Sequence, residues 1–224
     1  MNTMTYSADA TAILNELVQR RITHLCHFTT FGNVRSIFKM GALYSRQTLE
    51  ELRVPADFQD PLRCDGARYI NLSIHEVNFR LLSKFAYDQP YAEWCILRLR
   101  KEICMRTGVR FTTDNAAAGQ VRQYGTAEGV FGLKALFAAS VPAKAGCVTR
   151  KANKPMNLPT SPQAEVLCPE PIALRDVMDV MVVNWEAKQR LVNKYGIPEA
   201  LVKVGERCFP SMLRCRSYEG AVMD

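Results

Sequence analysis

Apolar side chains recur at helical spacing near the start of the chain. From Ile13 to Val18 they share one face, and the positions between them are polar. This pattern predicts an amphipathic helix over residues 8–21. Ser7 precedes the helix and is a suitable N-cap, because its hydroxyl can accept a hydrogen bond from the backbone of the first turn.

The pattern then changes to one that is typical of strands. Residues 22–28 alternate and are rich in residues that suit a sheet, which predicts a strand, and a helix over residues 33–40 should end at Gly41. Similar patterns predict further strands at residues 68–74, 94–100, 109–113, 163–168 and 177–183. They predict further helices at residues 75–86, 128–139, 186–195 and 198–208.

The order of these elements favours an α+β fold with mostly antiparallel strands, because strands and helices do not alternate regularly. The chain has neither a G-x-G-x-x-G fingerprint nor a Walker P-loop, so a nucleotide would need another kind of site. Residues 49–66 contain two prolines and several acidic residues, which predicts a long loop or a helical turn followed by a loop. Loops of that length usually carry function.

Composition is typical of one globular domain, which we expect to span residues 1–224. The 224 residues are 48% hydrophobic and 23% charged, unlike disordered or collagen-like chains. No apolar stretch reaches the roughly 18–20 residues that span a bilayer, and residues 1–6 do not resemble a secretion signal. We therefore expect a cytoplasmic protein with no role at a membrane.

The candidate metal ligands are eight cysteines and three histidines. The cysteines form no C-x-x-C pair and the histidines form no H-E-x-x-H motif, so we expect no metal site. Disulfides are the weaker alternative in a chain of this size without a secretion signal. Reduced and mostly buried thiols are expected instead.

The net charge of +7 is concentrated in the middle of the chain. Residues 101–164 hold nine basic and three acidic side chains, whereas the segments on either side are nearly neutral. Such a surface can face a polyanion, because Lys and Arg that neutralise phosphates release counterions. A surface that merely keeps the protein soluble is an equal alternative on charge alone.

Three segments contain residue types that suit chemistry. Residues 22–33 place His27, hydroxyls and Asn33 at a strand end, where they could bind a ribose or an amide, or simply bond internally and cap a helix. Residues 111–119 end a strand at a turn that small residues follow.

The third segment, residues 161–167, combines a carboxylate with an apolar strand. Gln163 and Glu165 lie two residues apart and should project from one face of that strand. A carboxylate on an apolar strand is costly unless it is paired or used. The alternative is an edge strand whose polar face lies in water.

Taken together, the three segments resemble the DarT family in order and spacing, over residues 22–183. Members of this family are toxins of toxin–antitoxin and phage-defence systems that ADP-ribosylate bases in single-stranded DNA with NAD. The resemblance implies an ADP-ribosyltransferase-like split sandwich of two small, mostly antiparallel sheets with flanking helices and NAD in the cleft. It also implies a macrodomain antitoxin as partner and NAD as the co-substrate.

The same resemblance implies roles for individual residues. His27 and Thr29 would contact the ribose and nicotinamide side of NAD, and Asn33 would support that loop or touch the cofactor. Glu165 would be the catalytic glutamate. Gln163 would help to choose the acceptor. The family also uses an arginine from the loop region after the first helix, for which Arg46 and Arg53 are both candidates. The candidate contacts to nucleic acid are Asn115, Arg150, Lys151 and Lys154.

These residue types suit the cleavage of the bond between nicotinamide and ribose, which develops oxocarbenium character. A carboxylate at the ribose would stabilise that charge, and no metal is required. We therefore expect a NAD-dependent mono-ADP-ribosyltransferase acting on single-stranded DNA, with guanine or thymine as the base. The alternatives are RNA, a protein or small molecule as acceptor, and a non-catalytic module that binds nucleic acid.

Overall fold

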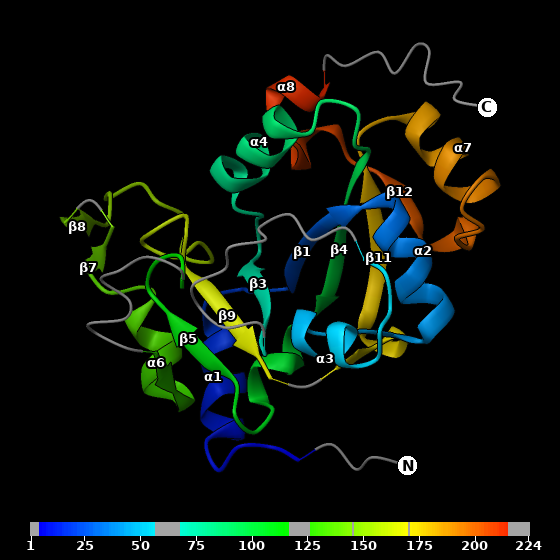
Figure 1. Cartoon of the computed structure of the whole chain (residues 1–224). Helices are drawn as coiled ribbons and strands as arrows, with labels where there is room; N and C mark the ends of the chain where they lie inside the picture. The colour runs from blue at the N-terminus through cyan, green and yellow to red at the C-terminus, as the bar shows by residue number, and fades with distance from the viewer. Residues whose placement is uncertain (1–4, 57–67, 117–125, 145, 170, 215–224) are drawn as a thin grey trace.

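The computed structural model describes residues 5–56, 68–116, 126–144, 146–169 and 171–214. Its main strands are β1 His24–Thr30, β3 Ile70–Ile74, β4 Trp94–Arg100, β5 Arg110–Thr112, β6 Ala127–Glu128, β9 Glu165–Cys168, β11 Val177–Val182 and β12 Val202–Val204. They form a sheet in the order β12-β11-β4-β1-β3-β9-β5-β6 (Figure 1). Neighbouring strands are antiparallel except for β11 and β12, which confirms the predicted α+β class.

Helices surround this sheet, and two short strand pairs flank it. The helices are α1 Ala10–Gln19, α2 Phe31–Met40, α3 Arg46–Glu51, α4 Phe79–Asp88, α6 Gly129–Ala135, α7 Trp185–Asn193 and α8 Ser211–Arg214. The short pairs join β2 Ala42–Leu43 to β10 Ile172–Ala173, and β7 Ser140–Ala143 to β8 Gly146–Thr149. Helices α2 and α7 lie beside β1, β4, β11 and β12, whereas α1 and α6 lie beside β5 and β9 (Figure 1).

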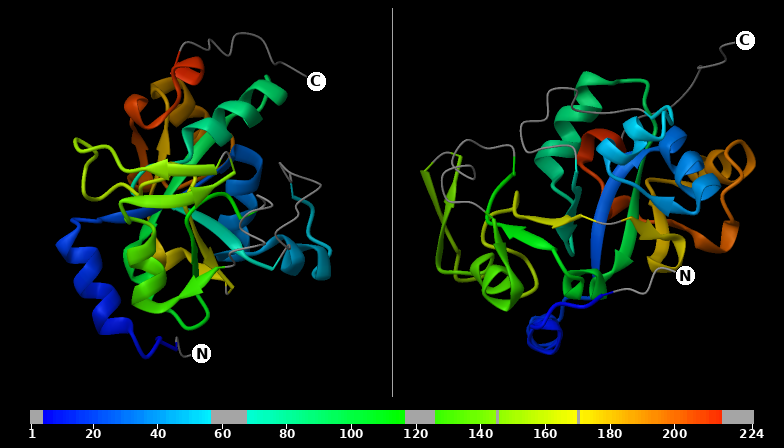
Figure 2. Two further views of the ribbon diagram at one scale, coloured as in Figure 1. Left: turned by 90° about the vertical axis from the view of Figure 1, so that its left-hand side faces the viewer. Right: turned by 60° about the horizontal axis from the view of Figure 1, so that its bottom comes forward.

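The sheet has two halves that are weakly joined. Strands β1 and β4 pair along seven residues, from His24–Arg100 to Thr30–Trp94. Strands β1 and β3 pair at only two positions, Leu25–Ile74 and Cys26–Ser73. The two halves can be followed from two further directions in Figure 2. Strand β3 therefore links β12-β11-β4-β1 to β9-β5-β6 by a short contact.

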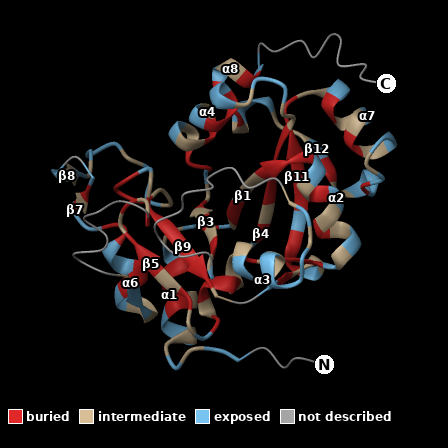
Figure 3. Cartoon of the chain, in the orientation of Figure 1, coloured by how far each residue is buried: buried red, intermediate tan, exposed pale blue. Residues whose placement is uncertain are grey.

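The core consists of the apolar residues that line both halves. Leu25, Leu72 and Leu97 are almost fully buried in three different strands, and Leu17 brings the apolar face of α1 into the same cluster. Figure 3 shows that buried residues follow the strands and the helix faces turned toward them. The predicted amphipathic character of the first helix therefore explains where it packs.

Some predicted boundaries were wrong because local hydrogen bonds changed them. Helix α1 begins at Ala10 after Asp9, and the Ser7 hydroxyl accepts the N–H of Asp9 instead of capping the first turn. Helix α4 begins at Phe79, since His75 has a positive φ of 65° and forms part of a turn. The first strand begins at His24 and reaches Thr30, two residues beyond its predicted end.

One predicted helix, over residues 198–208, is wrong in type. Its centre is the strand β12, which pairs in parallel with β11 through Val202 and Val204 and lies between two 3₁₀ turns. The hairpin β7–β8 was not predicted, because its sequence is dominated by small residues and lacks clear alternation. Within the described ranges, no helix is long and apolar enough to cross a membrane.

A buried ion pair fixes two turns at one end of the sheet. Arg106 directly follows the 3₁₀ helix Lys101–Met105, and Asp176 ends the 3₁₀ helix Leu174–Asp176. The guanidinium of Arg106 donates a hydrogen bond to the Asp176 carboxylate at 2.6 Å. Both side chains are at least 90% buried. Removing one partner of such a pair leaves a buried charge without compensation.

We expect Asp176→Ala to lower the free energy of unfolding by about 3–5 kcal/mol, because Arg106 then remains buried without its counter-ion. Asp88→Ala is a suitable control, since Asp88 pairs with Lys84 at the exposed surface and its loss should cost less than about 1 kcal/mol. Urea denaturation of both variants measures the difference. Equal destabilisation by the two substitutions would show that the Arg106 pair does not stabilise the fold.

Candidate active site

A cavity opens where β1 and β3 separate. Beyond the Cys26–Ser73 pair both strands continue, β1 to Thr30 and β3 back to Ile70, but they no longer pair. This part of β3 pairs with β9 instead. The cavity is lined by β1, α2, α3, β3, the start of α4, and Asn115 and Glu165.

The cavity has an apolar wall and a small set of polar groups. Apolar side chains on α2, α3 and the adjoining segments form the wall, including Ile37, Met40, Leu43, Leu49 and Val54. Among the described lining residues, Glu165 is the only carboxylate and Arg46 is the only lysine or arginine. A largely apolar cavity with a few placed polar groups is typical of a small-molecule site.

Glu165 is the first residue of β9 and is held from two sides. It is only 5% exposed, and its Oε2 accepts hydrogen bonds from Asn71 Nδ2 at 3.1 Å and from the backbone N–H of Ala116 at 2.8 Å. A buried carboxylate needs such donors to offset the loss of hydration. Because β9 lies between β3 and β5, the alternative of an edge strand with a solvated glutamate is wrong.

His27, Thr29 and Asn33 meet at the cavity, on β1 and the first turn of α2. The Nδ1 of His27 lies 3.0 Å from the backbone carbonyl of Asn71, and because a carbonyl only accepts, this nitrogen carries the hydrogen. Asn33 Nδ2 donates to the hydroxyl of Thr29 at 3.1 Å. Thr30 caps α2 by accepting the Asn33 N–H, which fixes the asparagine relative to β1.

The structure separates the two candidate arginines. Arg46 is the first residue of α3, which Ser45 caps by accepting the Thr48 N–H. Arg46 lines the cavity and donates to Glu50 at 2.7 Å. Arg53 follows α3 with a positive φ of 55°, is exposed and does not belong to the lining. The predicted loop thus begins as a helix, and its residues 57–66 lie outside the described part of the chain.

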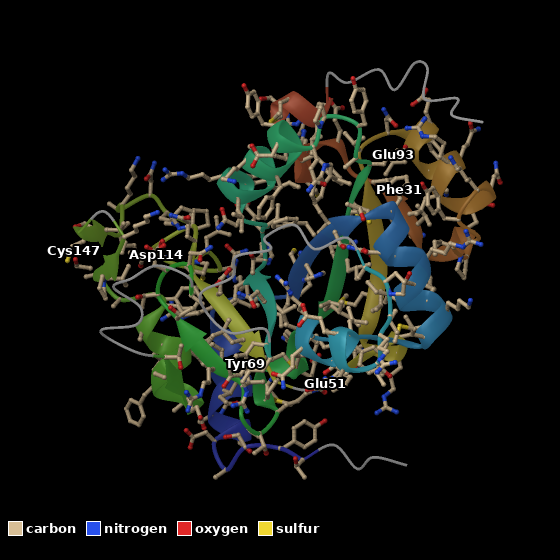
Figure 4. All side chains as sticks on the ribbon, viewed as in Figure 1. Phe31, Glu51, Tyr69, Glu93, Asp114 and Cys147 are labelled. Carbon is tan, nitrogen blue, oxygen red and sulfur yellow. The ribbon has the colours of Figure 1, made fainter. Side chains whose placement is uncertain are left out.

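The turn after β5 is fixed by Asp114, which Figure 4 labels beside the hairpin β7–β8. Its carboxylate accepts the backbone N–H of Lys144 and the hydroxyl of Ser161, and its carbonyl accepts the hydroxyl of Thr112. Asp114 is 1% exposed. It therefore holds the backbone that presents Asn115 to the cavity and the Ala116 N–H to Glu165.

Gln163 does not share a strand face with Glu165. It lies in a turn before β9, where its N–H donates to the hydroxyl of Ser161 at 3.2 Å. The expectation that both side chains project from one strand is wrong, because Pro162 and the Ser161 bond delay the start of the strand. Gln163 is not among the residues that line the cavity.

The basic candidates Arg150, Lys151 and Lys154 lie in the segment after β8 and outside the cavity lining. Arg150 donates to the carbonyls of Leu158 and Pro155, at 2.8 and 2.7 Å, and Lys154 donates to that of Thr160 at 2.9 Å. Burial lowers the pKa of both groups, with a contribution from neighbouring basic residues. Two of the three thus shape their own loop, whereas Lys151 is exposed.

Asn71 is a site residue that the sequence analysis missed. A signal was present, because Asn71 interrupts the apolar residues Ile70, Leu72 and Ile74 in a predicted strand. Its amide holds Glu165 while its carbonyl holds His27, so one residue orients both groups. Burial raises the pKa of Cys26, which also lines the cavity, so its thiol is neutral and a poor nucleophile.

Comparison with protein families gives a match to the model described as "ssDNA thymidine ADP-ribosyltransferase, DarT" over residues 26–206. Comparison with curated protein sequences gives no match. In the described part of the chain, no group of three or more His, Cys, Asp or Glu side chains could hold a metal ion.

Two solved structures have a similar fold. Thermosipho africanus DarTG in complex with ADP-ribose superposes with a TM-score of 0.55 at 16% identity, over 84% of this chain and 51% of that chain. Thermus sp. 2.9 DarT in complex with NAD⁺ gives a TM-score of 0.51 at 12% identity, over 84% of this chain and 98% of that chain. This chain thus spans about half of the DarTG chain and corresponds to nearly all of the DarT chain.

Proposed function

Because the chain belongs to the DarT family of ssDNA thymidine ADP-ribosyltransferases, we propose that it transfers ADP-ribose from NAD⁺ to thymine in single-stranded DNA. One observation carries this proposal. Glu165, the only carboxylate among the described lining residues, is buried and is held by two N–H donors at a largely apolar cavity. Such fixed charge is what a developing cation requires.

The lining suits the parts of NAD⁺. His27, Thr29 and Asn33 offer donors and acceptors for ribose hydroxyls and an amide. Arg46 supplies a guanidinium, which binds phosphate oxygens in a bidentate manner. The apolar wall can cover the flat rings. The fit supports NAD⁺ as the co-substrate and Arg46, in preference to Arg53, as the functional arginine.

Glu165 acts on the ribose in this proposal. The bond between C1′ and the nicotinamide nitrogen breaks, nicotinamide leaves with the electron pair, and the Glu165 carboxylate stabilises the positive charge that develops on the sugar. The acceptor nitrogen then bonds to C1′ and releases its proton to the solvent. Asn71 and the Ala116 N–H keep the carboxylate in one orientation, so it does not reorganise during the reaction.

The acceptor chemistry explains the preference for single strands. In thymidine N1 is already bonded to deoxyribose, so N3 is the ring nitrogen that remains. N3 lies on the pairing edge of the base, and an enzyme reaches it only when the base is unpaired and unstacked. Asn115 at the cavity is a candidate contact to this base, and Gln163 stays a candidate from the resemblance alone.

The surroundings of the site complete the proposal. The basic segment, with Lys151 exposed, would bind the phosphates of the strand. We place the protein in the cytoplasm, as one domain over residues 1–224, and a macrodomain antitoxin would control it. The thiols Cys26, Cys95, Cys104, Cys147 and Cys208 form no disulfides, which suits a reducing compartment.

The first test compares the wild type with Glu165→Gln. Each is incubated with NAD⁺ and an oligonucleotide that contains thymine, and mass spectrometry follows the addition of one ADP-ribose. We expect the variant to transfer about 10²–10³ times more slowly, because it lacks the charge that stabilises the transition state, while its affinity for NAD⁺ changes little.

Glu199→Gln is the control, since Glu199 is 73% exposed and pairs only loosely, at 3.4 Å, with Lys188. Oligonucleotides without thymine, an RNA of the same sequence and a carrier protein are tested alongside. A Glu165→Gln variant as fast as the wild type would refute the role of the glutamate. If RNA or the carrier protein is labelled and DNA is not, the labelled molecule is the acceptor and the proposal of a DNA acceptor is wrong.

The second test distinguishes the two arginines by calorimetric titration with NAD⁺. Arg46→Gln should weaken binding about tenfold or more, because a charge-assisted contact to phosphate is lost. Arg53→Gln should stay within about twofold of the wild type, as expected for an exposed side chain outside the cavity. The reverse order would identify Arg53 as the functional arginine.

A further inference from the structure

Asn78 is a polar residue of the cavity to which neither the resemblance nor the family match assigns a role. It is 3% exposed and contributes to the cavity lining at the start of α4. Its Oδ1 accepts the backbone N–H of Leu81 at 3.0 Å and so caps the helix. Because that N–H can only donate, Oδ1 is the capping atom, and Nδ2 takes no part in the cap.

The Nδ2 of Asn78 is buried and has no hydrogen-bond partner among the described residues. A buried donor without an acceptor destabilises the folded protein, and native structures contain few of them. Capping does not require this group, since Ser and Asp cap helices as well as Asn does. The additional donor is therefore explained best by an acceptor that arrives with a ligand.

The surroundings indicate the kind of ligand. Phe28, Leu81 and Phe85 line the same cavity as Asn78, and the rings of Phe28 and Phe85 lie 6.1 Å apart. Ser73, on the last part of β3 that still pairs with β1, adds a hydroxyl. Within the lining, apolar side chains beside the unsatisfied donor of Asn78 suit a flat ring that carries a carbonyl oxygen.

The turn that carries Asn78 is held firmly in place. His75 has a φ of 65°, its N–H donates to the carbonyl of His24 at 3.1 Å, and its carbonyl accepts the thiol of Cys26. These bonds tie the end of β3 to β1. Asn78, just after the end of β3, therefore keeps a fixed position relative to Asn71 on that strand, and through Asn71 to Glu165.

We propose that the Asn78 side chain donates a hydrogen bond to an amide carbonyl on a planar ring bound in this cavity, and so sets the specificity of the site. The two rings of the proposed reaction that carry such a carbonyl are the nicotinamide of NAD⁺ and the thymine of the acceptor. This inference rests on the proposed function.

The test uses two substitutions that keep the cap. Asn78→Asp retains the oxygen that accepts the Leu81 N–H and replaces the donor by an acceptor, and Asn78→Ser retains a capping oxygen and removes the donor. Asn184→Asp and Asn184→Ser are matched controls, because Asn184 caps α7 through the N–H of Ala187 and lies outside the cavity lining. Thermal unfolding verifies that all four variants fold.

Three titrations identify the ring. If Asn78 binds nicotinamide, NAD⁺ affinity falls about three- to tenfold in Asn78→Ser and further in Asn78→Asp, where two acceptors face each other, while affinity for ADP-ribose, which lacks nicotinamide, is unchanged. If Asn78 binds the base, both affinities are unchanged and the KM for a thymine oligonucleotide at saturating NAD⁺ rises by the same factors. The Asn184 variants should match the wild type in every titration.

The opposite results are equally clear. Unchanged NAD⁺ affinity together with an unchanged KM would reduce Asn78 to a helix cap and overturn the inference. An equal loss of affinity for NAD⁺ and ADP-ribose would overturn it too, because that pattern indicates a disturbed cavity and not a lost contact to the ring. A wild-type protein that binds no NAD⁺ would instead refute the proposed function on which the inference depends.

Discussion

The early end of the pairing between β1 and β3 is the constraint on which the site depends. Two strands that continue side by side but stop exchanging hydrogen bonds leave backbone groups and side chains facing a gap. Here β3 turns to β9 for its partners, and His27 reaches across to the carbonyl of Asn71. The cavity, the buried glutamate and the groups that orient it all follow from that separation.

A buried carboxylate is the most costly element of this arrangement, and the fold supplies two donors for it. Asn71 comes from the strand on one side, and the Ala116 N–H comes from the turn that follows the strand on the other. Hydrogen bonds to Asp114 from the Lys144 N–H and the Thr112 hydroxyl hold this turn in place. The glutamate is therefore oriented by a side-chain amide on one neighbouring strand and by a backbone N–H in the turn after the other. Such preorganisation is what stabilises a developing positive charge.

Much of the fold could be predicted from local patterns. The strand at Trp94–Arg100 and the end of α2 at Gly41 follow directly from alternation and from a glycine with φ of 79°. The strand Val202–Val204 could not be predicted, because it is a strand only through its parallel pairing with β11, a tertiary contact that overrides a helical pattern.

The candidate site could be predicted where its residues lie close together in sequence, and less so elsewhere. His27, Thr29 and Asn33 lie on one strand and the helix turn after it, and the structure brings them together as expected. The sequence does not show the role of Asn71, because its partner Glu165 lies 94 residues further along the chain. It does not single out Asn78 either, because that residue is distinguished by a buried amide donor that lacks a partner among the described residues. The proposed preference for Arg46 over Arg53 rests on which of the two lines the cavity, and the sequence does not reveal this.

The most direct measurement of the central claim is a crystal structure of Glu165→Gln with NAD⁺ bound, since the substitution should slow turnover without closing the cavity. The account predicts that the nicotinamide riboside lies between β1 and β3, with its ribose within hydrogen-bond distance of the residue at position 165 and of the groups on β1. NAD⁺ bound elsewhere, or with its ribose remote from position 165, would contradict the account.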